Sequence, residues 1–202
     1  DISKLSSIEE ALYRMLVPRL EADAIDPRSL TYYDKKLVTK DLARTAELKA
    51  KFRARAEEDP RLDTAIKRGR LFEAIVADQI EQSNWFGESA THRTASEFDD
   101  YVNHVDGIVE FEDEGTQTHL ALAVDVTKST QHIEEKLNDI RHSILSGKLT
   151  EVRYFTSHTQ EGSLKNVPRV IVGASQHTIE HVAQLIFTFE ATRKSAGAQN
   201  IS

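Results

Sequence analysis

The sequence contains no cysteine and no long hydrophobic run, and it has only four prolines and eight glycines. Without thiols the chain cannot form disulfides, thiolate zinc sites, iron–sulfur clusters or a cysteine nucleophile. Its longest uninterrupted apolar stretch covers residues 120–124, far short of the roughly 20 residues that span a membrane, and the N-terminus carries no apolar signal region. These absences predict a soluble, cytoplasmic protein with no membrane partner.

The common phosphate-binding and acyl-transfer motifs are also missing. No glycine-rich phosphate-cradling loop and no Gly-x-Ser-x-Gly nucleophile turn occurs in the sequence, which excludes P-loop enzymes, kinases and serine hydrolases of that type. What is present is a chain of 202 residues, 39% hydrophobic and 29% charged. That length is sufficient for one well-buried core, or for one domain with an accessory segment.

Charge is distributed unevenly along the chain, whose net charge is −7. Residues 35–70 hold 12 basic and 6 acidic side chains, whereas residues 71–127 hold 1 basic and 13 acidic side chains. A dense carboxylate region beside a cationic surface is typical of a divalent-metal site that acts on a polyanion. A solvated acidic loop beside a solvated basic helix gives the same pattern, so charge alone leaves both interpretations open.

Helix propensity and hydrophobic spacing predict helices, then a sheet, then further helices and strands. The first helix should be broken by the region of Pro18 and Pro27. In the last two helices, Ile144 and Phe189 end apolar stripes that are expected to face the core. The helices are expected at residues 8–20, 40–58, 62–82, 130–146 and 176–193, and the strands at residues 91–95, 101–111, 119–127, 151–156 and 169–173.

This order predicts an α/β or α+β protein with a mixed β-sheet flanked by helices. We expect residues 1–60 to form a helical accessory segment and residues 61–194 to form the main domain. The small, polar residues 195–202 are expected to be a disordered tail.

Two carboxylates stand out in the predicted sheet. Asp125 follows five apolar residues on what should be the most buried strand, and Asp106 lies in a strand that is flanked by apolar residues. If these strands form a hairpin, both carboxylates lie on one face of the sheet. An unpaired buried carboxylate is costly, and two of them repel each other unless a cation such as Mg²⁺ or Mn²⁺ lies between them.

A third carboxylate, Glu73, lies on the preceding helix. It falls in the same helical sector as Gly69, Val76 and Ile80, so it borders the buried stripe. We expect the missing side chain at Gly69 to let this helix approach the sheet closely. Glu73 could then complete a metal's coordination shell or hold a metal-bound water, or it could form a peripheral salt bridge.

Three short segments carry these residues in a recognisable order. They are GRLFE at residues 69–73, VDGIV at residues 105–109 and AVDVT at residues 123–127. Together they resemble the PD-(D/E)XK nuclease superfamily, whose core is a helix bearing Glu, a strand bearing Asp, a strand ending in an acidic-x-Lys element, then a helix and a further strand. The resemblance covers residues 62–156, and the Gly-x-x-x-Glu element resembles the Holliday-junction-resolvase branch.

The family's lysine position is occupied by Thr127. In the family this lysine orients the attacking water and stabilises developing negative charge. Lys128 is adjacent, but strand alternation points it to the opposite face unless the strand bulges or has ended. Lys136, at the edge of the buried stripe of the next helix, could reach over the strand end.

The resemblance implies a restriction-endonuclease-like fold and a metal-dependent hydrolase that cuts phosphodiester bonds, with DNA as the expected substrate and an endonuclease as the expected type. Asp106, Asp125 and the carbonyl of Val126 would bind Mg²⁺ or Mn²⁺ with Glu73, and Lys136 or Lys128 would add positive charge. Pairing as a homodimer is expected by the same resemblance. Backbone contacts to the nucleic acid are expected from Lys49, Arg53, Arg68 and Arg70.

Two alternatives remain open at this point. The chain could be a catalytically degraded relative that acts as a nucleic-acid-binding or scaffold subunit, because Thr127 replaces the lysine. It could also be an unrelated α/β protein in which the carboxylates coincide by chance.

Overall fold

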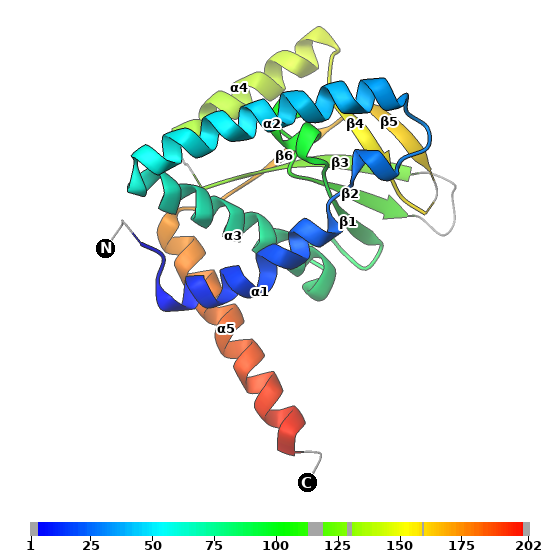
Figure 1. Cartoon of the computed structure of the whole chain (residues 1–202). Coiled ribbons are helices and arrows are strands. Elements are labelled where there is room, and N and C mark those ends of the chain that lie inside the picture. The colour runs from blue at the N-terminus through cyan, green and yellow to red at the C-terminus, as the bar shows by residue number, and fades with distance from the viewer. Residues whose placement is uncertain (1–3, 113–118, 129–130, 159, 200–202) are drawn as a thin grey trace.

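The computed structural model describes residues 4–112, 119–128, 131–158 and 160–199. It shows a mixed α/β protein in which helices flank a mixed sheet (Figure 1). Helix α1 (Ser7–Asp23) begins with a reciprocal cap: the Ser6 hydroxyl accepts from the Glu9 amide at 3.2 Å, and the Glu9 carboxylate accepts from the Ser6 amide at 2.7 Å. A short 3₁₀ turn, η1 (Pro27–Ser29), follows α1.

Pro18 lies inside α1 and does not break it, so the predicted break is wrong at this position. A proline within a helix removes one backbone hydrogen bond and costs about 3 kcal/mol. Leu16, Val17 and Leu20, around the proline, are buried against α3. Their burial offsets the cost, because each buried aliphatic side chain contributes about 1.5–3 kcal/mol.

Helices α2 (Lys35–Glu58) and α3 (Pro60–Ser83) follow each other almost without a linker. The Asp59 side chain caps α3 by accepting from the Arg61 amide at 2.9 Å, and Pro60 occupies the first turn, where its missing N–H has no cost. At the other end, Asn84 adopts a left-handed conformation with φ of 50° and stops α3. Helix α3 occurs where the sequence predicts it, and α2 ends as predicted but begins at Lys35, before its predicted start at residue 40.

Four strands form the main sheet in the order β1-β2-β3-β6. Strands β1, β2 and β3 are antiparallel neighbours, and β6 pairs with β3 in parallel. The crossover between β3 and β6 contains α4 (Gln131–Ser146) and a separate two-stranded sheet. The strands are β1 (Ala90–Thr94), β2 (Gly107–Glu112), β3 (His119–Thr127), β4 (Thr150–Thr156), β5 (Glu161–Val167) and β6 (Arg169–Gly173).

The predicted strand at residues 101–111 is wrong in its first half. Asp99–Asn103 form a π-helix, η2, and β2 begins only at Gly107. The buried Asp99 carboxylate holds this turn in place by accepting from the Asn103 side chain at 2.7 Å and from the backbone amides of Arg153 and Tyr154 at 2.7 and 3.0 Å. Strand β5, which lies between two predicted strands, is missing from the sequence prediction.

The two faces of the main sheet have different covers. On one face, Phe72 and Val76 of α3 and Ile179 of α5 (Gln176–Gln199) pack with Val109 and Val124. On the other face, Ile108 and Ala123 pack with the β4–β5 sheet and α2. The core residues from this second cover are Val38, Val152, Tyr154, Phe155 and Val167.

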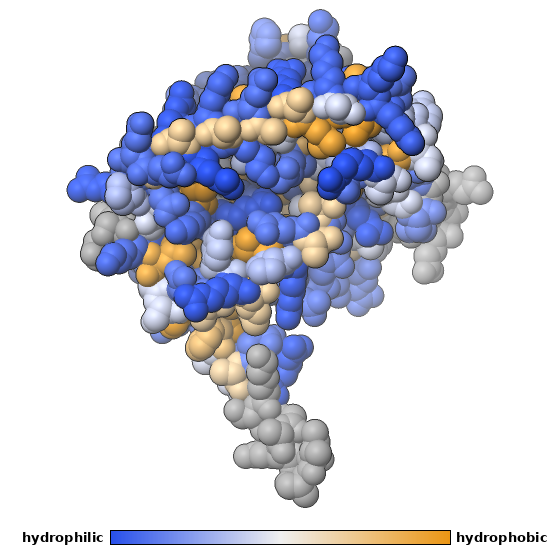
Figure 2. Space-filling model, viewed as in Figure 1, coloured by the Kyte–Doolittle hydropathy of each residue, from blue (hydrophilic) through white to orange (hydrophobic). Residues whose placement is uncertain are grey.

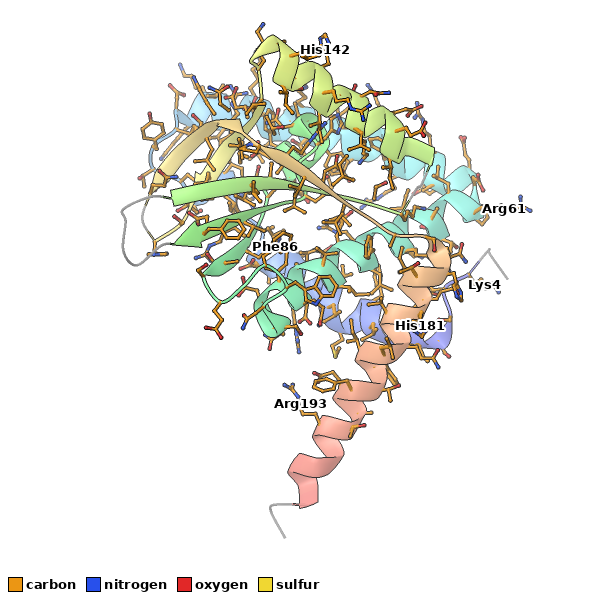
Figure 3. All side chains as sticks on the ribbon, turned by 180° about the vertical axis from the view of Figure 1, so that it is seen from behind. Lys4, Arg61, Phe86, His142, His181 and Arg193 are labelled. Carbon is orange, nitrogen blue, oxygen red and sulfur yellow. The ribbon has the colours of Figure 1, made fainter. Side chains whose placement is uncertain are left out.

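Helices α4 and α5 expose apolar residues that the sequence places in the core. Ile144 and Phe189, which end the predicted stripes, are 61% and 67% exposed. Helix α4 ends at Gly147 as predicted, with φ of +67°, whereas α5 extends past its predicted end into residues 195–199 and projects from the body, carrying Arg193 with it (Figure 3). No helix among the described residues is both long enough and apolar enough to cross a membrane.

Candidate functional site

Asp106 and Asp125 face each other at the ends of β2 and β3. Gly107 pairs with Val124 in the antiparallel register, and the Asp106 amide donates to the Val124 carbonyl at 2.8 Å. The register therefore places Asp106 opposite Asp125, where side chains of neighbouring strands lie on the same face. The Asp106 carboxylate also accepts from the Val126 amide at 2.5 Å.

The Asp125 carboxylate is buried on the central strand and is only partly satisfied. Its Oδ1 accepts a hydrogen bond from the Lys136 ammonium group, which comes from the first half of α4. Its Oδ2 lies 4.0 Å from Arg169 Nη1 and has no hydrogen-bond partner among the described residues. Buried polar atoms normally have a hydrogen-bond partner. The Oδ2 atom of Asp125 can therefore accept a further donor or a cation.

Glu73 joins this pair from α3. The Arg70 Nη1 atom lies 2.6 Å from Glu73 Oε2, one helical turn away. Burial, together with the negative charges of Asp100 and Asp125, raises the pKa of Glu73 to about 7 although Arg70 opposes the change. The structure thus brings together the three carboxylates that the sequence singles out.

Asp100 is a fourth carboxylate that the sequence analysis missed. It lies on η2, and burial together with the adjacent Asp106 raises its pKa to about 7. Burial together with Glu73 raises the pKa of Asp106 further, to about 8. The signal that could have found Asp100 is the acidic pair at residues 99–100, which lies directly before the predicted strand at residues 101–111 and belongs to no predicted element. The structure places this pair on a π-helical turn, a feature that often occurs at functional sites.

Chemically, this cluster is a set of oxygen donors whose ionised forms repel one another. Oxygen donors of this kind suit Mg²⁺ or Mn²⁺, and the unpartnered Asp125 Oδ2 fits the same ions. Within the described residues, no group of three or more His, Asp or Glu side chains is arranged to hold a metal ion. The nearby cations are Lys136, Arg70 and Arg169, and the Val126 amide donates a hydrogen bond.

The two lysine candidates lie in different places. Lys136 contacts Asp125. Lys128 instead lies beside α3 near Gly69, and burial together with Arg68 lowers its pKa. Of these two lysines, Lys136 is therefore the one that contacts the carboxylates.

The expected tight approach at Gly69 is wrong. A Cβ atom placed on Gly69 would meet the Lys128 side chain at 3.9 Å, an ordinary van der Waals distance. The absence of a side chain is therefore not what brings α3 to the sheet. Gly107 differs, because a Cβ atom there would come within 2.3 Å of the buried His92 ring.

The four predicted nucleic-acid contacts do not form one surface. Arg68 is buried and pairs with Glu9 at 2.6 Å, so the prediction of a backbone contact by Arg68 is wrong. Arg70 lies in the carboxylate site, and Lys49 pairs with Glu97. Arg53 is exposed on α2.

Comparison of the chain with protein-family models, with curated proteins and with solved structures finds no match. The functional conclusion therefore depends on the geometry of the site.

Proposed function

We propose that this protein is a divalent-metal-dependent nuclease, with DNA as its substrate and endonucleolytic cleavage of phosphodiester bonds as its reaction. The observation that carries the proposal is the meeting of Asp106, Asp125 and Lys136 from three separate elements. An acidic pair with an adjacent lysine at the end of a central hairpin supplies both the oxygen donors and the positive charge that phosphodiester hydrolysis needs.

The topology supports a restriction-endonuclease-like fold as part of this proposal. The order α3-β1-β2-β3-α4-β6 contains a Glu-bearing helix, an Asp at the start of β2, an acidic residue near the end of β3, a crossover helix and a further strand. The further strand is β6, not β4 as the resemblance over residues 62–156 implies. The β4–β5 sheet is then an insertion in the crossover, and the helices before α3 are an accessory segment.

Asp106, Asp125 and the carbonyl of Val126 would hold Mg²⁺ or Mn²⁺, and Glu73 would act through a metal-bound water, because the described carboxylates form no three-residue metal group. The bound ion would lower the pKa of its water and neutralise charge on the phosphate. Lys136 holds a positive charge at Asp125 Oδ1, where it stabilises negative charge that develops on the phosphate. Arg70 fixes the orientation of the Glu73 carboxylate.

The test compares cleavage of duplex, single-stranded and branched DNA and of RNA, with Mg²⁺, Mn²⁺ or EDTA. D125N and K136M should each lower the cleavage rate by at least about 100-fold, as loss of one preorganised group typically does. K128M is the matched control and should retain activity within a few-fold, because Lys128 lies beside Gly69. Equal loss in K136M and K128M, or metal-independent cleavage, would contradict the proposed roles.

A second candidate function is a catalytically degraded nuclease fold that binds nucleic acid. The observations that favour it are Thr127 at the lysine position and the lack, among the described residues, of a three-residue metal group. Thermal unfolding distinguishes the two functions: an intact site should be stabilised by millimolar Mg²⁺ or Mn²⁺, with no such shift in D125N. A folded wild type that binds DNA, cuts nothing and shows no metal shift would favour the degraded form.

A further inference from the structure

An aromatic pair, of which Phe52 is exposed and Tyr101 is half-buried, lies between α2 and η2. The rings of Phe52 and Tyr101 are 5.9 Å apart between centroids and inclined by 59°. Phe52 is 47% exposed although it lies on a helix with a buried side. An aromatic face that stays open to solvent beside a second ring is a surface on which a planar group can stack.

This aromatic pair borders the carboxylate site. Tyr101 directly follows Asp100 on η2, and burial together with the charges of Asp100 and Glu97 raises the pKa of the Tyr101 hydroxyl. Glu73 contributes to the same change. The aromatic surface and the proposed reaction centre are therefore neighbours, and one bound nucleotide chain could contact both.

Several basic side chains lie around Phe52 on α2, and one of them, Lys49, pairs with Glu97. Lys49 and Arg55 lie three residues before and after Phe52, on the same side of α2, and the adjacent Lys51 and Arg53 are exposed. In Figure 2, hydrophilic side chains run beside a narrow row of apolar residues along α2. A basic helix carrying an exposed ring combines backbone attraction with base stacking, as in sites for single-stranded nucleic acid.

We propose that Phe52 and Tyr101 bind an unpaired base, so that the substrate class is nucleic acid with a single-stranded segment next to the cleavage point. This inference rests on the proposed nuclease function. What it predicts directly is a preference for binding single strands over duplexes. Bases inside a duplex are already stacked and cannot lie on a side-chain ring. Only an unpaired nucleotide presents a free face to Phe52.

The test measures fluorescence anisotropy of a labelled 20-nucleotide single strand and of a blunt duplex of the same sequence, in EDTA so that no cleavage occurs. F52A should weaken binding of the single strand by about 5-fold or more and binding of the duplex by less than 2-fold, because loss of one stacking partner affects only free bases. F52W should retain the preference for the single strand. W85A is the matched control, because Trp85 is similarly exposed, at 50%, in the acidic part of the chain.

The outcomes separate this inference from the proposed function. Equal weakening of both ligands by F52A, no effect of F52A, or no nucleic-acid binding by the wild type would overturn the stacking proposal, even if metal-dependent cleavage is found. A single-strand preference that depends on Phe52 would support the stacking proposal even if no cleavage is found. Circular dichroism of F52A checks that the exposed substitution leaves the fold intact.

Discussion

Helix α3 carries two groups of buried charge within two turns, and they are built differently. Arg68 and Glu9 form a closed pair: the Glu9 carboxylate accepts from Arg68 Nε at 2.6 Å and from the Ser6 amide, and Arg68 Nη2 donates to the Lys4 carbonyl at 3.2 Å. Burial alone would raise the pKa of Glu9, but the hydrogen bonds from Arg68 and Ser6 hold it below its usual value.

Five residues later, Glu73 belongs to a group of carboxylates whose charges are not fully matched by donors. Glu73, Asp100 and Asp106 all have a raised pKa, with burial as the first cause and neighbouring carboxylates as a further one. Within the part of the chain that the structure describes, Asp125 Oδ2 has no hydrogen bond. Burial of charge therefore does not by itself indicate function. A buried carboxylate with matched donors holds the fold together, whereas carboxylates left in mutual repulsion are suited to bind something else.

The largest expected effect tests the closed pair. R68A should lower the free energy of unfolding by about 3–5 kcal/mol, because it leaves the Glu9 carboxylate buried without its partner. Urea denaturation followed by circular dichroism measures this. R61A, at an exposed position of the same helix, should change stability by less than about 0.5 kcal/mol. A loss below about 1 kcal/mol in R68A would show that the pair is not structural.

The second prediction concerns the pH dependence of stability that arises from Glu73, Asp100 and Asp106. Carboxyls with a pKa of about 7 to 8 in the folded protein and about 4 when unfolded bind more protons in the folded state between these values. Their stabilising contribution is present at low pH and is lost as pH rises through 7 to 8. In EDTA, the free energy of unfolding should therefore fall between about pH 6.5 and 8, by up to about 1.4 kcal/mol per pH unit for each extra proton bound in the folded state, and should level off above about pH 8.

D106N is the matched control for this pH dependence. An amide at position 106 can still accept from the Val126 amide and carries no charge, so the fall in stability between about pH 6.5 and 8 should become shallower. Burial lowers the pKa of His92 to about 4, so His92 makes stability rise with pH only below its unfolded pKa of about 6.5, outside this range. A stability that stays flat or rises between about pH 6.5 and 8 in the wild type would contradict the interpretation that these carboxylates lack matched donors.

The smallest effect concerns the residue between the two groups. G69A should raise the free energy of unfolding by about 0.5–1 kcal/mol, because alanine favours a helix interior over glycine and its Cβ meets Lys128 only at 3.9 Å. G147A should instead destabilise the protein, because Gly147 has φ of +67°. Loss of stability in G69A would show that α3 does need the missing side chain.

The sequence predicted much of the fold where local pattern suffices. Helix α3 and strands β1 and β3 occur at the expected residues because their hydrophobic spacing and capping residues are local properties. The same pattern failed for η2, because its shape depends on Asp99 binding to backbone amides more than 50 residues away. It failed for α4 and α5 because a helical apolar stripe does not say whether another element covers it.

At the site, the order of Glu73, Asp106 and Asp125 and the two candidate lysines can be predicted from the sequence alone. The packing of the elements adds that Lys136 contacts Asp125, that Asp100 joins the carboxylates, and that Arg68 pairs with Glu9. The difference comes from the range of the interactions along the chain. Spacing along the chain fixes which face a residue occupies within its own element, whereas the charge that opposes a buried carboxylate comes from whichever element the fold packs beside it.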